Sequence, residues 1–330
     1  MARFYLEADC DESLLGDRTV AVVGYGSQGR AQALNLRDSG ISVIVGLREE
    51  SSSIARAQVE GISVAPIQDA VRDADIISLL VPDEVHGEVF KRFINPEMKK
   101  GATLCLAHGL SIRFAILRPR EDIDVVMMAP LGAGRLLRQR YLEGTHLPCY
   151  VAVHQDRTGN ALRVVLAYAL AAGCARAGIL ETTFKNEAEI DLFGEQAVLC
   201  GGISFLLLRA FEVLVDNGYP PEMAYMECID QLKASADLIS VAGLDGLTEN
   251  ISSPALHGML TRGGRIVGKE TERAMRELLG EIQSGEFVKE WRTEGTGDRP
   301  ELLRLLREWK SHRMHEVGRD IRKRTDSSRR

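Results

Sequence analysis

The first half of the chain alternates short apolar runs with longer amphipathic segments. The short runs are rich in Val and Ile and are followed by Gly, Pro or His, which is typical of buried strands. They occupy residues 19–23, 42–45, 76–81, 103–107, 125–129 and 150–153. Helix-length segments, such as 28–37 and 161–171, lie between several of them. This strand–helix order predicts a parallel sheet that helices cover on both faces.

The pattern changes after about residue 181, where stretches with a period of about 3.6 residues replace the short apolar runs. These stretches lie at residues 189–215, 221–240 and 269–284. We therefore predict an α/β domain at residues 1–183 and an all-helical domain at 184–330, which suits a length of 330 residues. The segment from about residue 300 to 330 is rich in Lys and Arg, and we expect a basic, partly disordered tail there.

Composition excludes several classes of protein. The 45% hydrophobic and 27% charged residues are ordinary for a soluble globular chain. The longest uncharged apolar run is too short to span a membrane, and the first residues lack the apolar core of a signal peptide, so we expect neither. The six cysteines form no C-x-x-C pair, which favours reduced thiols and a cytoplasmic location. A net charge of −6 gives no footprint for nucleic acid.

A glycine-rich motif follows the first strand of the pattern and opens a helix. It reads Gly24, Tyr25, Gly26, Ser27, Gln28 and Gly29, which is G-x-G-x-x-G. Gly24 would permit the tight turn, Gly26 would let a pyrophosphate approach the backbone, and Gly29 would let the helix pack closely on the strand. Free amides at the start of the helix favour phosphate. The motif in this context predicts a Rossmann dinucleotide site.

The end of the second strand decides which dinucleotide is preferred. An NAD site usually has an acidic residue there, whereas this chain has Arg48 followed by Ser51 and Ser53. A guanidinium and hydroxyl groups suit a 2′-phosphate, so we predict NADPH, with NADH as the alternative. Glu49 and Glu50 oppose this prediction if their carboxylates point toward the phosphate.

Two pairs of oxygen-bearing side chains occur at i, i+4 spacing in the helical half. Asp191 and Glu195 form one pair, and Glu227 and Gln231 form the other. Such spacing puts both members on one helix face, and converging oxygens are what Mg²⁺ binds. Acid pairs on solvated helix faces have the same spacing, so the spacing alone leaves both interpretations open.

Several blocks of sequence together resemble the ketol-acid reductoisomerase family, in its shorter-chain class. The resemblance extends over about residues 1–295, and its blocks are 23–29, 35–40, 45–48, 80–84, 107–109, 176–184, 191–202 and 221–225. It implies a Rossmann domain followed by a knotted, all-helical domain that dimerises. It also implies that the metal site draws ligands from both subunits of a homodimer or a larger homo-oligomer.

The resemblance implies a reaction in two steps, in which Mg²⁺ ions promote migration of an alkyl group in a hydroxy keto acid and NADPH then reduces the product. Asp191 would bridge the ions, with Glu195 and Glu227 as further ligands. Ser252 would contact the substrate, and His108 would lie near the reacting atoms. The cofactor-binding set would also include Pro82, Asp83, His108 and Gly134.

Three departures from the family pattern fall on the chemistry, and the first of them lies in the segment that follows the strand at residues 125–129. Leu131 stands where the family has a lysine, and Arg135 lies where it has a histidine. Gln231 replaces the fourth metal carboxylate, which makes occupancy by one or by two Mg²⁺ ions an open question. Asp230 replaces a histidine. Ala133 differs in the same motif as Leu131, and the pocket segments change too, at Pro254 and Leu256 near Ser252 and at residues 112–114.

These observations together predict an NADPH-dependent reductase of a small keto or imine substrate, with a weakened or lost isomerase step, in specialised metabolism. One alternative is a true ketol-acid reductoisomerase of branched-chain amino acid biosynthesis. Another is a non-redox enzyme or binding protein whose Rossmann cleft holds a nucleotide-bearing ligand. We expect a small-molecule substrate and no nucleic-acid or membrane partner.

Overall fold

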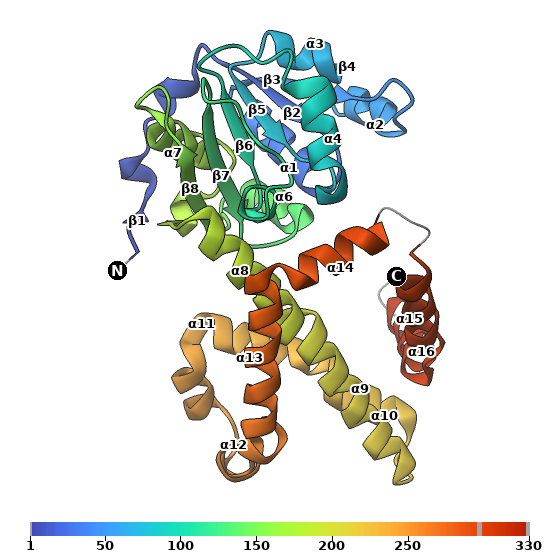
Figure 1. Cartoon of the computed structure of the whole chain (residues 1–330). Helices are drawn as coiled ribbons and strands as arrows, with labels where there is room; N and C mark the ends of the chain where they lie inside the picture. Colours follow the sequence, from blue (N-terminus) through green and yellow to red (C-terminus); the bar gives the residue numbers. More distant parts are fainter. Residues whose placement is uncertain (1, 296–298, 328–330) are drawn as a thin grey trace. The chain divides into compact units, whose positions relative to one another are not determined.

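The apolar runs of the first half become strands of one nine-stranded sheet in the first of two units, residues 1–190 (Figure 1). The computed structural model describes residues 2–295 and 299–327. The strand order is β1-β9-β8-β7-β6-β5-β2-β3-β4. The strands are β1 (Phe4–Tyr5), β2 (Thr19–Val23), β3 (Ser42–Leu47), β4 (Ser63–Pro66), β5 (Ile76–Leu79), β6 (Thr103–Leu106), β7 (Asp124–Pro130), β8 (Cys149–Gln155) and β9 (Ile179–Glu181).

Strands β2 to β7 pair in parallel, as predicted, but β8 runs antiparallel to β7. The predicted parallel arrangement is therefore confirmed for β2 to β7 and is wrong for the pairing of β7 with β8. Pro130 at the end of β7 pairs with Cys149 at the start of β8, so the chain leaves and re-enters the sheet at the same end. An apolar run shows that a strand is buried but carries no information about its direction. The short strands β1, β4 and β9, which have two to four residues, were not predicted.

Alternate residues of the strands point to opposite faces of the sheet, and each face has its own apolar core. In β2, Val20 and Val22 belong to one core, whereas Ala21 and Val23 belong to the other. The first core packs beneath helices α1 (Ser27–Asp38), α2 (Ser53–Val59), α6 (Gly134–Leu142) and α7 (Ala161–Ala171). The second packs beneath α3 (Ile67–Arg72), α4 (His86–Val89) and the π-helical turn η4 (Phe90–Ile94), while the short α5 (Leu110–Arg113) follows β6.

Every regular element described in residues 191–295 and 299–327 is helical, as predicted. The first helix, α8 (Phe184–Gly194), begins in the first unit and continues through the π-helical turn η6 (Glu195–Leu199) into α9 (Gly201–Asp216). The remaining helices are α10 (Pro221–Tyr225), the π-helical turn η7 (Met226–Asp230), α11 (Leu232–Asn250), α12 (Ser253–Ile266), α13 (Lys269–Ser284), α14 (Glu286–Gly295), α15 (Pro300–Ser311) and α16 (Arg313–Ser327).

The expectation of a partly disordered tail is wrong for residues 300–327, which form α15 and α16. Met314 of α16 is buried with Phe211 and Tyr225 in a small core of the second unit. A Cβ on Gly318 would lie 2.5 Å from the Tyr225 ring, so α16 packs directly on α10. The charges that suggested a tail therefore belong to two helices with amphipathic sequences. Residues 328–330 lie outside the described residues.

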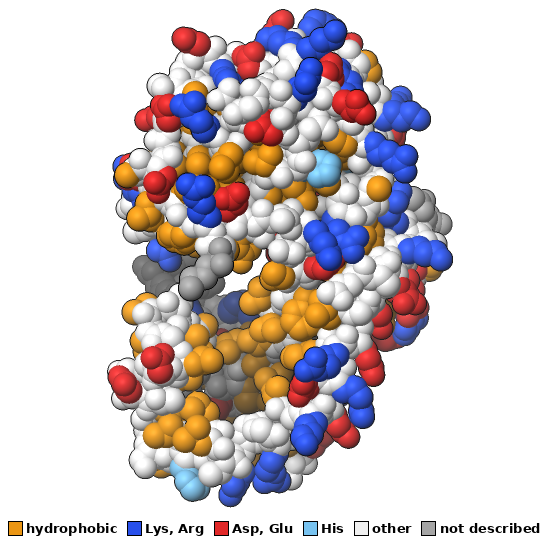
Figure 2. Space-filling model, turned by 60° about the vertical axis from the view of Figure 1, so that its left-hand side comes forward, with side chains coloured by type: hydrophobic (Ala, Val, Ile, Leu, Met, Phe, Trp, Pro, Cys, Tyr) orange, Lys and Arg blue, Asp and Glu red, His pale blue; other side chains and the backbone are white. Residues whose placement is uncertain are grey.

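The helices of the second unit leave many apolar side chains exposed, as Figure 2 shows. Exposed residues include Leu199, Phe205, Leu206, Val213 and Met226. The continuous helix Phe184–Asp216 is long and apolar enough to cross a membrane, although the sequence predicted no span. A single helix of this kind is weak support for membrane insertion, because an apolar helix at a subunit interface has the same composition.

Candidate active site

The glycine loop between β2 and α1 is shaped by close backbone packing. Gly24 has a φ of +105°, and a Cβ there would lie 2.7 Å from the Leu80 carbonyl oxygen, so only glycine fits. A Cβ on Gly29 would lie 2.3 Å from the Gly24 carbonyl oxygen. Gly26 differs, because the space around its Cβ position is open. The loop therefore leaves room for a phosphate to approach its backbone at the start of α1.

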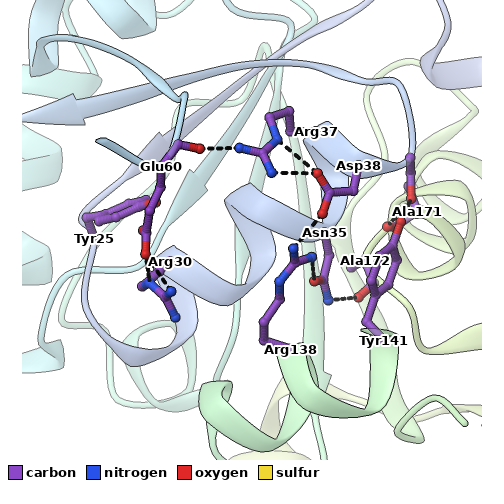
Figure 3. Close-up of polar contacts among 11 residues, drawn as sticks. Tyr25, Arg30, Asn35, Arg37, Asp38, Glu60, Arg138, Tyr141, Ala171 and Ala172 are labelled. Carbon is purple, nitrogen blue, oxygen red and sulfur yellow. Dashed lines mark hydrogen bonds and ion pairs between the residues drawn. The ribbon is translucent and has the colours of Figure 1, made fainter. Parts of the chain in front are cut away.

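Polar contacts fix α1, which carries this loop, against its neighbours (Figure 3). The Tyr25 hydroxyl donates to Glu60 Oε2 at 2.8 Å, and Arg30 Nε donates to Glu60 Oε1 at 2.8 Å. The hydrogen bond from Arg30 holds the pKa of the Glu60 carboxyl below its usual range. Near the other end of α1, Arg138 of α6 donates to Asn35 Oδ1 at 2.8 Å. These contacts hold the loop and its helix in one position before any ligand binds.

A cavity of about 420 Å³, which we term the loop cavity, opens beside the glycine loop. It is bounded by the loop, by the end of β3 and by the segment that follows β5. Seven of the predicted cofactor-binding residues line it: Gly24, Tyr25, Gly26, Arg48, Ser51, Ser53 and Pro82. Glu49 and Glu50 line a neighbouring cavity instead. The two carboxylates that opposed the NADPH prediction therefore do not line the loop cavity.

Six other residues predicted to bind cofactor do not line the loop cavity, namely Ser27, Gln28, Gly29, Asp83, His108 and Gly134. Two of them join α6 to the loop. Gln28 Nε2 donates to the Gly132 carbonyl at 2.9 Å, and a Cβ on Gly134 would lie 2.0 Å from the Ser27 carbonyl oxygen. Gly134 is thus required for packing, and cofactor contacts by these six residues stay predictions.

One wall of the loop cavity was not predicted from the sequence. This wall comes from the helical segment after Pro82 and consists of Val85, Glu88, Val89, Arg92 and Phe93. The spacing of these residues puts them on one helix face directly after the third strand of the sequence pattern. That spacing is the sequence feature from which this wall could have been predicted. The same spacing is also typical of a helix that only packs on the sheet.

His108 follows β6 and lies near a buried carboxylate. Its Nε2 is 3.9 Å from Glu187 Oε2, and the same oxygen accepts a hydrogen bond from the Gly109 backbone N–H at 2.6 Å. A Cβ on Gly109 would lie 2.2 Å from the Phe184 carbonyl oxygen, so α8 packs against this turn. Glu187 was not predicted from the sequence, because only the fold brings it beside His108.

Two further polar pairs surround this turn. His86 is buried, with Nδ1 2.8 Å from Ser111 Oγ and Nε2 2.9 Å from the Val81 carbonyl oxygen. Burial lowers the pKa of His86, which favours the neutral ring at neutral pH. Arg113, which belongs to a segment that departs from the family pattern, donates from Nε to Glu189 Oε1 at 2.7 Å. The departure therefore places a guanidinium, paired with a carboxylate, close to His108 in the chain.

The predicted metal ligands lie on two helical segments of the second unit. Asp191 in α8 and Glu195 at the start of η6 are exposed. At η7, Gln231 Nε2 donates to Glu227 Oε2 at 2.6 Å, so these two side chains share a helix face. Among the described residues of one chain, no three His, Cys, Asp or Glu side chains gather closely enough to hold a metal ion. The metal-ligand roles stay predictions. They are compatible with a site that draws ligands from two subunits, as the family resemblance implies.

The two predicted ligand pairs both coincide with π-helical turns. The Cys200 N–H donates to the Glu195 carbonyl at 2.8 Å, and the Gln231 N–H donates to the Met226 carbonyl at 3.2 Å. In each bond the partners are five residues apart, rather than the four of an α-helix. Such turns occur frequently at functional sites, so their position favours a functional interpretation of the acid pairs.

The remaining predicted residues are accessible. Ser252 caps α12, where its Oγ accepts a hydrogen bond from the Ala255 N–H at 3.4 Å, and its side chain is exposed. Leu131 is 43% exposed just after β7, and Arg135 is exposed in the first turn of α6. Position 131 therefore presents an apolar side chain with neither a charge nor a proton to transfer.

Two family models together match almost the whole chain. "Acetohydroxy acid isomeroreductase, NADPH-binding domain" matches residues 14–178, and "Ketol-acid reductoisomerase, C-terminal domain" matches residues 184–327. The second match includes α15 and α16, so it extends beyond the residues on which the resemblance was first based.

Individual proteins agree with the family models. The chain is 48% identical over 321 residues to a ketol-acid reductoisomerase (NADP(+)) of Methanothermobacter thermautotrophicus, covering 97% of this chain and 98% of that protein. It resembles the solved NADH-preferring ketol-acid reductoisomerase of an uncultured archean with a TM-score of 0.94 and 42% identity, covering 97% and 98% of the two chains. A semialdehyde dehydrogenase NAD-binding protein of Cupriavidus necator shares the fold alone, with a TM-score of 0.62 and 17% identity over 81% of this chain and 99% of that one.

Proposed function

Because the chain belongs to the ketol-acid reductoisomerase family, we propose that it is an NADPH-dependent reductase whose alkyl-migration step is weakened or lost. Family membership makes the protein an NAD(P)H-dependent oxidoreductase. The observation that carries the finer proposal is Leu131, an exposed apolar side chain where the family has a lysine. A lysine there can hold a proton beside the migrating centre, whereas leucine cannot.

The choice of NADPH rests on the loop cavity. Arg48, Ser51 and Ser53 line it and offer a guanidinium and two hydroxyl groups to a 2′-phosphate. Gly26 leaves its backbone open to the pyrophosphate. The two relatives are named for different cofactors, NADP(+) in one and a preference for NADH in the other, so the lining residues carry this choice.

The two i, i+4 pairs fit a magnesium site that has three carboxylates instead of the four of the family pattern. Asp191, Glu195 and Glu227 would hold the metal, with Gln231 supplying at most an amide oxygen. In the structure the Gln231 amide donates a hydrogen bond to Glu227, so that pair offers one carboxylate instead of two. A metal bound there would supply Lewis-acid polarisation of the substrate oxygens. Four carboxylates would balance two Mg²⁺ ions, whereas three leave a net positive charge on such a pair, and we therefore propose one ion.

The chain's own residues would bind and orient the substrate for reduction. The Ser252 hydroxyl, exposed at the start of α12, would contact the substrate. His108 would face the reacting atoms, and the Glu187 carboxylate lies 3.9 Å from its Nε2. Bound NADPH would supply the hydride. The substrate would be a small ketone or imine that bears a carboxylate.

A comparison of two substrates tests the proposal. With NADPH and Mg²⁺, we expect little turnover of 2-acetolactate, which needs alkyl migration before it can be reduced. We expect faster turnover of small 2-keto acids, which need reduction alone. Loss of the near-ultraviolet absorbance of NADPH measures both reactions. The proposal would be contradicted if the protein turned over 2-acetolactate faster than the small 2-keto acids.

Restoring the family residues provides a second test. The double variant Leu131→Lys, Gln231→Glu should raise 2-acetolactate turnover by about a hundredfold, the usual contribution of a proton-transferring group. Leu142→Lys, at another exposed leucine of the same unit, is the matched control and should change nothing. No gain in the double variant would favour a different explanation for the departures.

An ordinary ketol-acid reductoisomerase of branched-chain amino acid biosynthesis is the second candidate. Identity of 48% over nearly the whole chain favours it, as do the retained Asp191, Glu195 and Glu227. Under this alternative the wild-type protein turns over 2-acetolactate rapidly, and the double variant gains little. The same two assays therefore separate the candidates.

We also propose a cytoplasmic homodimer or larger homo-oligomer. The six cysteines are all free, which suits a reducing compartment. Exposed apolar side chains on α9, such as Phe205 and Val213, suit burial against a second copy. A partner subunit would also complete the set of metal ligands.

A further inference from the structure

Two arginines line the loop cavity from separate elements. Arg48 stands just after β3, whereas Arg92 lies in the π-helical turn η4 that follows α4. Of the two arginines, only Arg48 was predicted from the sequence to bind the cofactor. Glu88, which precedes Arg92 by one helical turn, is the third charged residue that lines this cavity. The lining thus has two cations and one anion.

Arg92 is held in place by weak contacts. Its Nη1 donates to Glu88 Oε1 at 2.6 Å, and the two side chains are 62% and 61% exposed. An ion pair so exposed contributes little free energy, so breaking it costs little. The Arg92 guanidinium also lies over the Phe93 ring, 5.0 Å from its centroid. The aromatic ring keeps the guanidinium near the cavity wall while leaving its donor groups available.

Arg48 has no carboxylate partner within the described residues. Its neighbours Glu49 and Glu50 line the adjoining cavity and are absent from the lining of the loop cavity. Arg48 alone offers one positive charge, whereas a 2′-phosphate carries nearly two negative charges at neutral pH. A second cation on the loop cavity would complete the charge balance.

We propose that Arg92 is a second recognition residue for the 2′-phosphate of NADPH, and that it exchanges Glu88 for the phosphate when the cofactor binds. This inference rests on the proposed use of NADPH and deepens it. The exchange replaces an exposed carboxylate partner with a doubly charged phosphate, which forms stronger hydrogen bonds with a guanidinium. Glu88 then acts against NADPH, because it competes for Arg92 and repels the phosphate.

The proposal predicts that substitutions of Arg92 and of Glu88 have opposite effects on NADPH binding. Arg92→Met should weaken NADPH binding by about tenfold, the lower end for a hydrogen bond to a charged group, and change NADH binding less than about twofold. Glu88→Gln should tighten NADPH binding by about threefold, with little effect on NADH. Arg92→Lys keeps the charge and should retain most of the affinity for NADPH.

Calorimetric titration of the purified full-length protein with each dinucleotide measures these effects without any substrate. Arg72→Met is the matched control, because Arg72 is an exposed arginine with carboxylate partners that lines neither cavity. Equal weakening of NADPH and NADH in Arg92→Met would overturn the proposal, since Arg92 would then contact the part that the two cofactors share. Unchanged NADPH binding would overturn it as well.

The wild-type titration separates this inference from the proposed function. If the wild-type protein binds NADH more tightly than NADPH, the proposed cofactor is wrong and the role of Arg92 falls with it. If the wild-type protein prefers NADPH and Arg92→Met keeps that preference, the proposed cofactor stands and only the role of Arg92 is refuted.

Discussion

The glycines around the phosphate loop serve different purposes that one motif does not distinguish. Gly26 leaves open space for a ligand, whereas Gly29 and Gly134 allow two backbones to meet. Gly134 was predicted to bind cofactor, yet its α-carbon packs against the Ser27 carbonyl. A sequence shows that a side chain is absent, and only the structure shows what occupies its place.

At the scale of single residues, Glu60 should make the stability of the first unit depend on pH. Arg30 and Tyr25 hold its pKa below the usual value of 4.5, so its carboxylate stabilises the fold above that pH. This stabilisation is lost as the pH falls through the lowered pKa. Glu60→Gln should therefore cost about 1 kcal/mol at neutral pH, and the difference from wild type should shrink below about pH 4.5.

Urea denaturation followed by circular dichroism at several pH values measures this effect. Glu121→Gln, which changes an exposed carboxylate of the same unit, is the control and should follow the wild-type curve. A difference between Glu60→Gln and wild type that stays constant down to pH 3 would show that the carboxylate charge is not the cause.

At the scale of elements, the π-helical turns are what the sequence pattern could not predict. The predicted helix over 189–215 is interrupted by η6, where the extra residue brings carbonyl oxygens close to Gly201 and Gly202. A Cβ on Gly201 would lie 2.1 Å from the Gln196 carbonyl oxygen. A pattern of apolar residues tolerates one inserted residue, so it does not show where a turn widens.

The glycine requirement of this turn can be tested. Gly201→Ala should destabilise the second unit by about 1–3 kcal/mol, because the backbone must shift to relieve the contact. Gly258→Ala is the matched control, since this helical glycine in α12 has nothing within 4 Å of its Cβ position. The control should be neutral or slightly stabilising. Scanning calorimetry compares them, and equal melting temperatures would contradict the close packing at η6.

At the scale of the whole molecule, the helices of the second unit expose large apolar side chains, and its candidate metal ligands do not gather within the described part of one chain. Both features suit the homodimer that the family resemblance implies. Burial of the apolar faces and completion of the ligand set would then be one event.

Mixed dimers test whether two subunits share the site. Asp191→Asn and Glu227→Gln should each abolish Mg²⁺-dependent reduction when present in both subunits. Co-expression of the two variants should restore about a quarter of wild-type activity, because half of the dimers are hybrid and each hybrid has one unaltered site of two. The double variant Asp191→Asn, Glu227→Gln, co-expressed with an equal amount of wild type, is the control for expression level. Failure of the hybrids to regain activity would place all ligands of one site on one chain.

The sequence by itself determined the features that depend on neighbours along the chain. Runs of Val and Ile predicted the central strands, and the motif from Gly24 to Gly29 predicted the phosphate loop. Arg48, Ser51 and Ser53 were predicted as the cofactor-binding residues that follow β3. These features follow from local backbone preference and from which residues avoid water. The family resemblance added the activity and the candidate ligands in the helical half.

The tertiary structure alone decided which side chains meet. It set the direction of β8, packed α16 on α10, placed Glu49 and Glu50 on the adjoining cavity, and brought Arg92 to the same cavity as Arg48. Each of these depends on contacts between segments far apart in the sequence. Periodicity records that a side chain is buried but not what it is buried against, because the partner is chosen by packing of the whole fold.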